Sequence, residues 1–224
     1  MPSLVIPVAD ESRNLTLPLA LQSAQTHLQA VTPVLIGSSF LDYVIKDEAP
    51  TGRVIPFIQQ VPNDPIGNVT KMMMLALEDP AVTDPFIWSN DDIYFRSALE
   101  FQELYWASAT AQGKLHDQPT RGRYGMMSHR TLELLKAQRL PAWNYARHVP
   151  LIVHKEKMRE ALALGPGSPR SLYNNLILEE PWAVREDVKL FARDAEVSLD
   201  QLGPIFSTGN QFPIELIRKY LQLD

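Results

Sequence analysis

The first half of the chain alternates short apolar runs with longer segments of helical apolar spacing. The apolar runs at residues 4–8, 33–37 and 53–57 predict strands, and residues 17–28 and 68–77 have the spacing of buried helix faces. Strands that alternate with helices favour an α/β fold, so we expect a mostly parallel mixed sheet flanked by helices.

The second half is predicted to be more helical. Helices are expected at residues 97–111, 131–139, 156–164, 171–178 and 213–223, and an extended segment at 148–153. Residues 114–125 are polar and contain Gly and Pro, which predicts a loop, a candidate mobile segment over a site. We find no internal repeat and no clean linker, so we expect a single domain over residues 1–224.

The most informative segment lies between the two halves. Residues 85–88 predict a short buried strand, and Asn90, Asp91 and Asp92 follow it before apolar residues resume at 93–95. Adjacent carboxylates at a strand end repel each other unless a cation lies there, and hard divalent ions prefer carboxylate and phosphate oxygens. We therefore interpret the triplet as a metal–diphosphate clamp. The alternative is a polar turn in which Asn90 or Asp91 caps a helix.

Composition limits the function classes. The 224 residues contain no cysteine, which excludes disulfides, thiolate metal sites and a cysteine nucleophile. The N-terminal residues lack the basic and long apolar regions of a signal peptide, and no stretch approaches the ~20 apolar residues of a membrane span. We expect a cytoplasmic protein.

Charge is unevenly distributed. The chain has a net charge of −5, yet residues 114–159 contain ten basic and three acidic residues, a net +7. This indicates an anionic ligand or partner, with scattered solvent-exposed side chains as the alternative. The basic residues are Lys114, Arg121, Arg123, Arg130, Lys136, Arg139, Arg147, Lys155, Lys157 and Arg159.

Several catalytic motifs are absent. The sequence has no Walker-type loop, no Gly-x-Gly-x-x-Gly, no Gly-x-Ser-x-Gly and no His-Glu-x-x-His. This argues against the common nucleotide hydrolases, dinucleotide oxidoreductases, α/β hydrolases and zinc proteases. An acidic strand end and a basic second half are typical of group transfer from a diphosphate donor.

Residues 86–95 resemble the metal-binding strand end of GT-A glycosyltransferases. They resemble more closely the Asn-Asp-Asp segment of the Stealth family of sugar-phosphate transferases and of related phage glycosyltransferase-like proteins. Shorter similarities occur in the same order along the chain, at residues 17–24, 34–37, 68–71, 145–150, 170–175, 187–189 and 206–210.

This resemblance implies a GT-A-like domain with a nucleotide-sugar and metal half (residues 1–96) and an acceptor-side half (residues 97–224). It also implies a nucleotide-sugar donor, most consistently a UDP-sugar, and Mn²⁺ or Mg²⁺ as cofactor. Residues 5–9 lack the acidic and aromatic residues of the Stealth opening strand. We therefore favour glycosyl transfer, with sugar-phosphate transfer as the alternative.

The donor side of the expected site involves the triplet and the first loop. Asp92 is expected to bind the metal directly, and Asp91 directly or through water. Asn90 is expected to contact the donor ribose or a metal-bound water. Arg13 and Asn14 follow the first strand, where the nucleotide lies in this fold. An ordinary surface loop is the alternative for these last two.

Other candidates lie further along the chain. Lys71 and Arg170 are candidate diphosphate ligands, with a solvent-facing lysine and a capping residue as the alternatives. His148 is the candidate acid/base or phosphate-binding residue, since imidazole titrates near neutral pH; a structural histidine is the alternative. Asn174 is a candidate acceptor contact. Three aromatic residues are candidates to stack on a sugar or base, or to pack in the core: Trp143, Tyr145 and Tyr173.

The acceptor stays open at this level. The phage-like resemblance and the basic segment favour a hydroxymethylated pyrimidine in phage DNA, in which case the protein acts in the host cytoplasm. A capsule or cell-wall saccharide is the rival acceptor. A non-catalytic binding module that keeps the fold is the third hypothesis.

Overall fold

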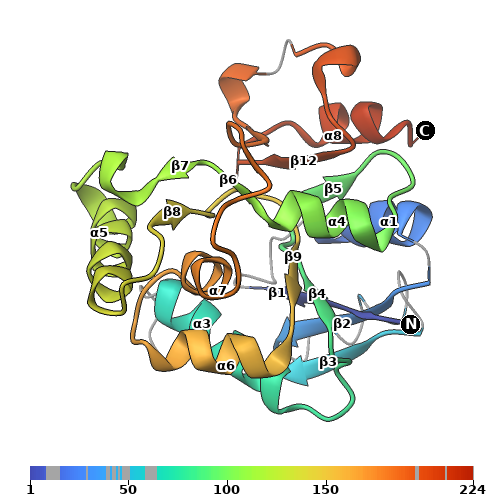
Figure 1. Ribbon diagram of the computed structural model, residues 1–224. Coiled ribbons are helices and arrows are strands. Elements are labelled where there is room, and N and C mark those ends of the chain that lie inside the picture. The colour runs from blue at the N-terminus through green and yellow to red at the C-terminus, as the bar shows by residue number, and fades with distance from the viewer. Residues whose placement is uncertain are drawn as a thin grey trace.

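The computed structural model describes residues 1–8, 16–28, 30–38, 41, 44, 46, 51–58, 65–194, 197–209 and 211–223. A five-stranded sheet forms the centre of the molecule (Figure 1). Its strands, in spatial order, are β3 (Arg53–Pro56), β2 (Thr32–Gly37), β1 (Ser3–Pro7), β4 (Phe86–Trp88) and β9 (Leu151–Val153). The first four are parallel, and β9 is antiparallel to β4. The predicted mixed, mostly parallel sheet is confirmed.

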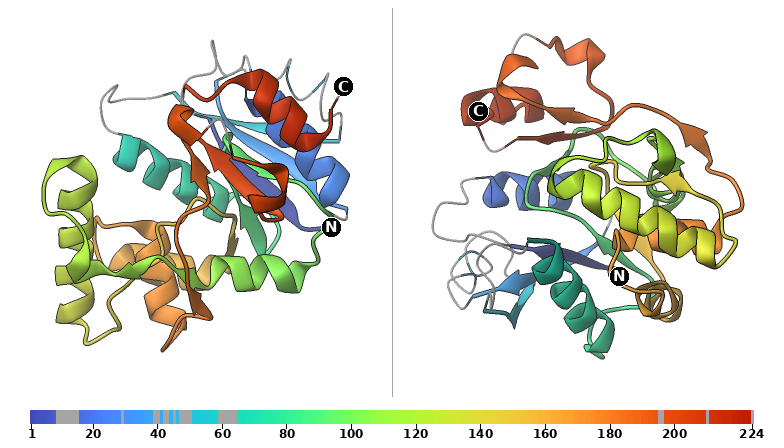
Figure 2. Two further views of the ribbon diagram at one scale, coloured as in Figure 1. Left: turned by 90° about the horizontal axis from the view of Figure 1, so that it is seen from above. Right: turned by 90° about the vertical axis from the view of Figure 1, so that its left-hand side faces the viewer.

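Helices cover both faces of this sheet (Figures 1 and 2). One face packs against α1 (Leu17–His27) and α4 (Phe101–Ser108). The other packs against α3 (Pro65–Glu78), α6 (Lys155–Ala163) and α7 (Pro169–Ile177), and α5 (Gly122–Ala137) lies beside α7. No helix of the described residues is long and apolar enough to cross a membrane.

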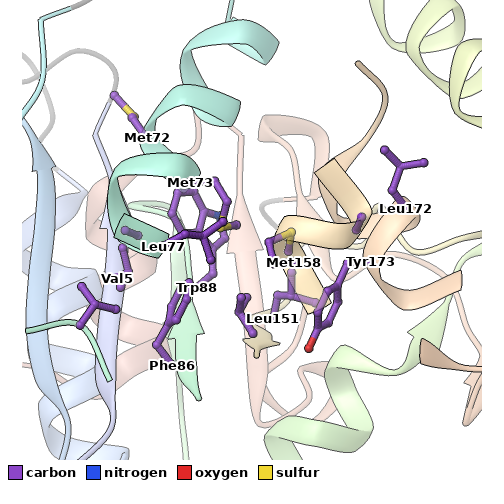
Figure 3. Close-up of a cluster of buried hydrophobic side chains, with 14 of the residues drawn as sticks. Val5, Met72, Met73, Leu77, Phe86, Trp88, Leu151, Met158, Leu172 and Tyr173 are labelled. Atoms are coloured by element: carbon purple, nitrogen blue, oxygen red, sulfur yellow. The ribbon is translucent and has the colours of Figure 1, made fainter. Parts of the chain in front are cut away.

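The strand sequences explain this arrangement. Successive side chains of a strand point to opposite faces, and both faces here are apolar, as expected of a sheet covered on both sides. Phe86 and Trp88 of β4 pack on the α3 side, whereas Ile87 packs on the α1 side. Figure 3 shows Phe86 and Trp88 beside Met73, which is 1% exposed. Of the three consecutive methionines, two thus fill the core, while Met74 is 48% exposed.

Shorter strands complete the second half. A three-stranded sheet joins β11 (Lys189–Leu190), β12 (Ile205–Thr208) and β5 (Ile93–Phe95), and it brings residue 189 next to residue 92. The remaining strands form pairs, β6 (Thr110–Ala111) with β10 (Ala183–Val184), and β7 (Gly113–Lys114) with β8 (Trp143–Asn144). The other helices are η1 (Leu115–Asp117), η2 (Ala192–Asp194), η3 (Leu199–Gln201) and α8 (Ile214–Leu221).

Two element predictions were wrong at their boundaries. Helix α5 begins at Gly122, so the predicted loop ends earlier than residue 125. Gly125 packs against the backbone of Pro119, where a Cβ would lie 2.3 Å from the carbonyl oxygen, so tertiary contact fixes this turn. Helix α4 is shorter than predicted, because the capping box of Glu100 and Glu103 starts it and strand β6 follows it.

Candidate functional site

The acidic triplet lies in a turn at the carboxyl end of β4. The Ser89 N–H donates to the Val5 carbonyl at 2.9 Å, and the Ile93 N–H donates to the Asn90 carbonyl at 3.3 Å. The chain then enters strand β5. The triplet therefore connects two strands, and the alternative in which Asn90 or Asp91 caps a helix is wrong.

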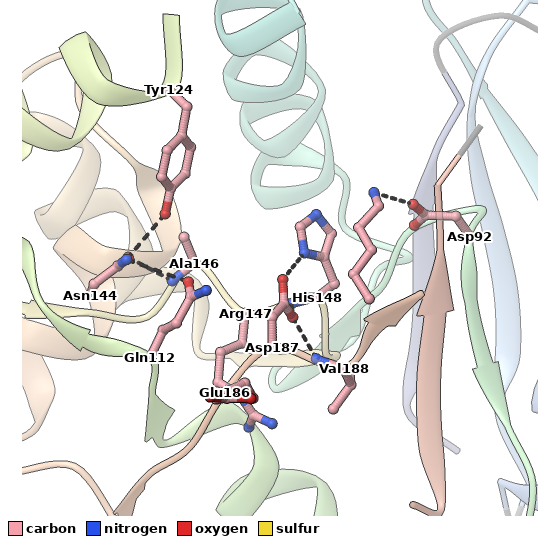
Figure 4. A network of polar contacts seen from close by, with 11 residues as sticks. Asp92, Gln112, Tyr124, Asn144, Ala146, Arg147, His148, Glu186, Asp187 and Val188 are labelled. Atoms are coloured by element: carbon pink, nitrogen blue, oxygen red, sulfur yellow. Dashed lines mark hydrogen bonds and ion pairs between the residues drawn. The ribbon is translucent and has the colours of Figure 1, made fainter. Parts of the chain in front are cut away.

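Asp92 has one satisfied and one unsatisfied oxygen. Its Oδ2 accepts a hydrogen bond from Lys189 Nζ at 2.9 Å, and both side chains are less than a fifth exposed (Figure 4). Its Oδ1 is buried and has no hydrogen-bond partner among the residues that the structure describes. A buried carboxylate oxygen without a donor is costly, so this atom fits a further cation.

The two carboxylates of the turn fit a divalent metal that also binds the phosphate of a ligand. They fit a metal surrounded only by protein side chains less well. No group of three or more His, Asp or Glu side chains gathers among the described residues. Mg²⁺, however, is commonly held by one or two carboxylates together with substrate phosphates. Asp91 and Asp92 would be those carboxylates. The pKa of the neighbouring Tyr94 hydroxyl is raised, mainly by burial and to a smaller extent by the charges of Asp92 and Asp91.

His148 is held by Asp187 beside this turn. The imidazole Nδ1 lies 2.5 Å from Asp187 Oδ2, while the backbone N–H groups of His148 and Val188 each donate to Oδ1 at 2.8 Å (Figure 4). Burial alone would raise the pKa of Asp187, but these hydrogen bonds and the His148 charge outweigh it and lower the pKa. With Nδ1 donating, the Nε2 of a neutral imidazole is a proton acceptor.

Two guanidinium groups lie next to this pair. Arg147 is 7% exposed, and its Nε donates to the Glu186 carbonyl at 2.9 Å. Arg170, at the start of α7, is half-buried and makes a long contact of 3.4 Å from Nη1 to the Pro150 carbonyl. Burial lowers the pKa of Arg147, and it lowers that of Arg170 to about 10, so Arg170 stays cationic at neutral pH.

One cavity of about 330 Å³ joins these groups. Asn90 of the triplet and Trp88 of β4 line it together with His148, Arg147 and Arg170. The other lining residues come from α3, α5, the segment before β9 and the start of α7: Val69, Met73, Tyr124, Met127, Ala146, Leu151, Ser168 and Pro169. The Asn144 amide donates to the Tyr124 hydroxyl at 3.1 Å, which fixes that wall (Figure 4).

Other predicted site residues lie elsewhere. Lys71 is exposed and lines a separate groove with Phe57 and Glu78. Asn174 is 1% exposed, and its amide donates to the Ser108 carbonyl at 2.9 Å, a position in the interior. Arg13 and Asn14 lie outside the described residues.

Two of the candidate stacking residues belong to the core. Tyr145 and Tyr173 are each 1% exposed. Trp143 is half-buried, and Lys114 Nζ lies 3.1 Å from the centroid of its ring. None of the three lines the cavity with His148.

The basic segment does not form one continuous surface. Arg147 is buried, whereas Lys155 and Arg159 donate to carbonyls of Asp79 and Leu77. The exposed basic residues lie on or beside α5, at the left of Figure 1, and on α6, along the bottom of the same view. The charge excess of residues 114–159 is thus distributed over an interior arginine and two separate helices.

Sequence reasoning assigned no site role to Asp187 or Lys189, and it named Arg147 only as one residue of the basic segment. Each lies in or next to a segment that resembles the glycosyltransferase-like proteins, at 145–150 and 187–189, which was the available signal. No local pattern pairs Lys189 with Asp92, because the strands that align them are far apart in the chain.

The fold was compared with known proteins. The sequence matches no protein-family model, and it matches no curated protein. Among solved structures, the galactosyltransferase LgtC in complex with donor and acceptor sugar analogs aligns over 99% of this chain and 94% of its own, at 12% identity and a TM-score of 0.52.

The glycosyltransferase GlyE from Streptococcus pneumoniae TIGR4, in its apo form, aligns over 100% of this chain, at 10% identity and a TM-score of 0.51. The match covers 60% of the GlyE chain. Identities this low establish similarity of fold alone. The chain therefore has the α/β fold of GT-A glycosyltransferases, with a mostly parallel sheet flanked by helices.

Proposed function

We propose that the protein is a glycosyltransferase that moves a sugar from a nucleotide-sugar, a UDP-sugar, to an acceptor hydroxyl. One observation supports this above the others. A single cavity at the carboxyl end of β4 contains Asn90 of the acidic turn, the His148 imidazole and the cationic Arg170. Ligands of open α/β sheets bind at such strand ends.

The proposed donor site centres on the acidic turn, with residues 1–96 as the donor half. Asp91 and Asp92 would hold Mn²⁺ or Mg²⁺, in keeping with the unpartnered Oδ1 of Asp92. When bound, the metal neutralises negative charge that develops on the leaving diphosphate. Asn90 is placed to contact the donor from the cavity side.

His148 is the proposed general base. Its Nε2 takes the proton of the acceptor hydroxyl while that oxygen bonds to the anomeric carbon and the bond to the diphosphate oxygen breaks. Asp187 holds Nδ1 at 2.5 Å and stabilises the imidazolium that forms. A base in this role corresponds to inversion of the anomeric centre.

The test is donor binding. We expect UDP to raise the thermal unfolding midpoint of the wild-type protein, more in Mn²⁺ than in EDTA, and a nucleoside without phosphates to leave it unchanged. If no nucleoside diphosphate stabilises the protein in either condition, the enzyme proposal is refuted. Retention of the shift in both Asp91→Ala and Asp92→Ala, with Mn²⁺ still effective, would favour a binding module.

The acceptor is proposed to contact the half formed by residues 97–224. A hydroxymethylated pyrimidine in phage DNA stays a prediction, and the division of the basic residues between two helices favours a smaller acceptor. A salt titration separates the two, because phosphate-backbone binding weakens steeply with salt whereas neutral-glycan binding does not. Product mass distinguishes glycosyl from sugar-phosphate transfer.

A further inference from the structure

The cavity beside His148 is lined by two arginines, one buried and one half-buried, that form no ion pair with a carboxylate of the described residues. The terminal nitrogens of Arg147 have no hydrogen-bond partner in the described part of the chain, although the residue is 7% exposed. Arg170 donates only to the Pro150 carbonyl, at 3.4 Å, among those same residues. Buried charges are normally paired, because an unpaired charge loses hydration without compensation.

The nearby carboxylate does not fill this role. Asp187 exerts an electrostatic attraction on both arginines, yet its two oxygens accept hydrogen bonds from the His148 ring and from the backbone N–H groups of His148 and Val188. No hydrogen bond of the described residues joins either guanidinium to Asp187, so their remaining donors are available to a ligand. Guanidinium pairs bind phosphate and carboxylate groups in bidentate geometry.

The start of α7 strengthens the same preference. Ser168 caps this nine-residue helix and, with Pro169 and Arg170, lines the cavity. Pro169 has no N–H, and the Ser171 N–H donates to the Ser168 hydroxyl, so this helix attracts an anion through the positive end of its dipole. The apolar walls at Trp88, Met73 and Met127 lower the local dielectric constant and strengthen that attraction.

The position of Arg147 separates it from the carboxylates that are proposed to hold the donor's diphosphate. In Figure 4, His148 lies between Asp92 and Arg147. A diphosphate bound through a metal at Asp91 and Asp92 would occupy the Asp92 side of the imidazole. The cavity that extends from Asn90 past His148 to Arg147 has a volume of about 330 Å³, the size of a small-molecule site rather than of a duplex surface.

We infer that the acceptor of the proposed reaction is a small hydroxyl compound that carries an anionic group, and that Arg147 and Arg170 bind this group. This inference rests on the proposed glycosyl transfer and specifies its acceptor class. Phosphate and carboxylate share the required chemistry. In the bound complex the anion anchors the acceptor while His148 Nε2 faces the attacking hydroxyl.

The experiment measures the binding of three probes to the wild-type protein by calorimetry, with UDP and Mn²⁺ at saturation. The probes are glucose 6-phosphate, glucuronic acid and glucose. We expect one or both anionic sugars to bind at least about tenfold more tightly than glucose, as charge-assisted hydrogen bonds require. Comparing glucose 6-phosphate with glucuronic acid shows whether the site prefers a phosphate or a carboxylate as the anionic group of the acceptor.

Variants assign the binding to the arginines. Arg170→Gln should weaken the anionic sugars about tenfold or more and leave UDP affinity unchanged, with Arg170→Lys intermediate. Arg130→Gln, an exposed residue of α5, is the matched control and should change neither. Arg147→Gln provides a second test where its fold is retained by circular dichroism.

Three outcomes overturn the inference while the proposed function stands. Glucose and the anionic sugars could bind alike. The anionic sugars could compete with UDP. Arg170→Gln could weaken UDP instead of the anionic sugars, which would assign the arginines to the donor diphosphate. Failure of UDP itself to bind, in contrast, refutes the proposed function and this inference with it.

Discussion

Asp92 of the acidic turn and Arg147 of the cavity lie on either side of His148 (Figure 4), and the charges of the two regions are arranged in opposite ways. Asp92 in the turn has an ammonium group, that of Lys189, at 2.9 Å. Arg147 and Arg170 in the cavity donate to backbone carbonyls and to no carboxylate of the described chain. The charge of the turn is thus compensated by a direct ion pair, whereas Asp187 attracts the two arginines without a hydrogen bond to either among the described residues.

This difference teaches how far each region depends on the chain's three-dimensional arrangement. The turn is a run of three neighbouring residues, and its character is visible in the sequence. The cavity combines α3, the end of β4, α5 and the start of α7, together with the segment before β9. Only the packing of these elements places two arginines and a histidine around one space.

The largest effect is expected at the residue between the two regions. His148→Ala removes the proposed base and should lower kcat roughly 100-fold to 10,000-fold, with UDP affinity unchanged. Steady-state kinetics and calorimetry measure the two quantities. His154→Ala, whose side chain is 52% exposed, is the matched control. Equal kinetics for both variants would remove His148 from the mechanism.

Removing the Asp92 charge from the acidic turn should have the next largest effect. Asp92→Asn leaves the Lys189 ammonium buried without its carboxylate, which we expect to cost on the order of 3 kcal/mol of unfolding free energy. The same change should abolish the Mn²⁺ dependence of UDP binding. Denaturant unfolding and thermal shifts measure these. Asp117→Asn is the control, since its side chain is 66% exposed, and a matching loss there would contradict the role of Asp92.

Removing the Lys189 ammonium should strengthen metal binding at Asp92, the opposite of the effect expected for Asp92→Asn. Lys189→Met takes away a cation that competes with a divalent ion for Asp92, so we expect Mn²⁺ to bind about tenfold more tightly. Calorimetric titration of Mn²⁺ in the presence of UDP measures this. Lys136→Met on α5 is the control, because Lys136 is paired with the exposed Glu133. Weaker Mn²⁺ binding in Lys189→Met would show that Lys189 supports the donor site.

The smallest effect is expected for the stability contributed by Asp187, the carboxylate that holds the His148 imidazole. The folded-state pKa of Asp187 is lowered, so this carboxylate contributes stability that is present above about pH 4 and lost as the pH falls through its folded pKa. Asp187→Asn should therefore flatten the fall in stability below pH 4 and lower stability at pH 7. Denaturant midpoints between pH 2 and pH 7 measure this. An unchanged acid profile would mean that the His148 contact contributes nothing to folding.

Most of the fold was predictable because its signals are local. Apolar runs located strands β1 to β4, and helical spacing located α1, α3 and α6, since both faces of the sheet are buried and strands and helices have distinct periods. The start of α5 was missed because Gly122 and Gly125 suggest a loop, whereas packing against Pro119 and the contact between Tyr124 and Asn144 favour helix there.

The candidate site was predictable only in part. Asn90, His148 and Arg170, chosen from the sequence, line one cavity, whereas Lys71 and Asn174 do not line it. Helical or strand periodicity indicates that a residue is on an element, not which cavity its side chain reaches. For Asn174 the amide was a suitable ligand group, but the fold uses it to satisfy the Ser108 carbonyl in the interior.

The sequence alone determined the alternation of strands and helices, and it determined that a carboxylate pair follows a buried strand. Both depend on residues that are neighbours along the chain. The tertiary structure decided that Lys189 contacts Asp92, that Asp187 holds His148, and that Arg147 and Arg170 share a cavity without a carboxylate of their own. These contacts join residues that are distant in sequence, so only the packing of the elements that contain them could establish the charge balance of the site.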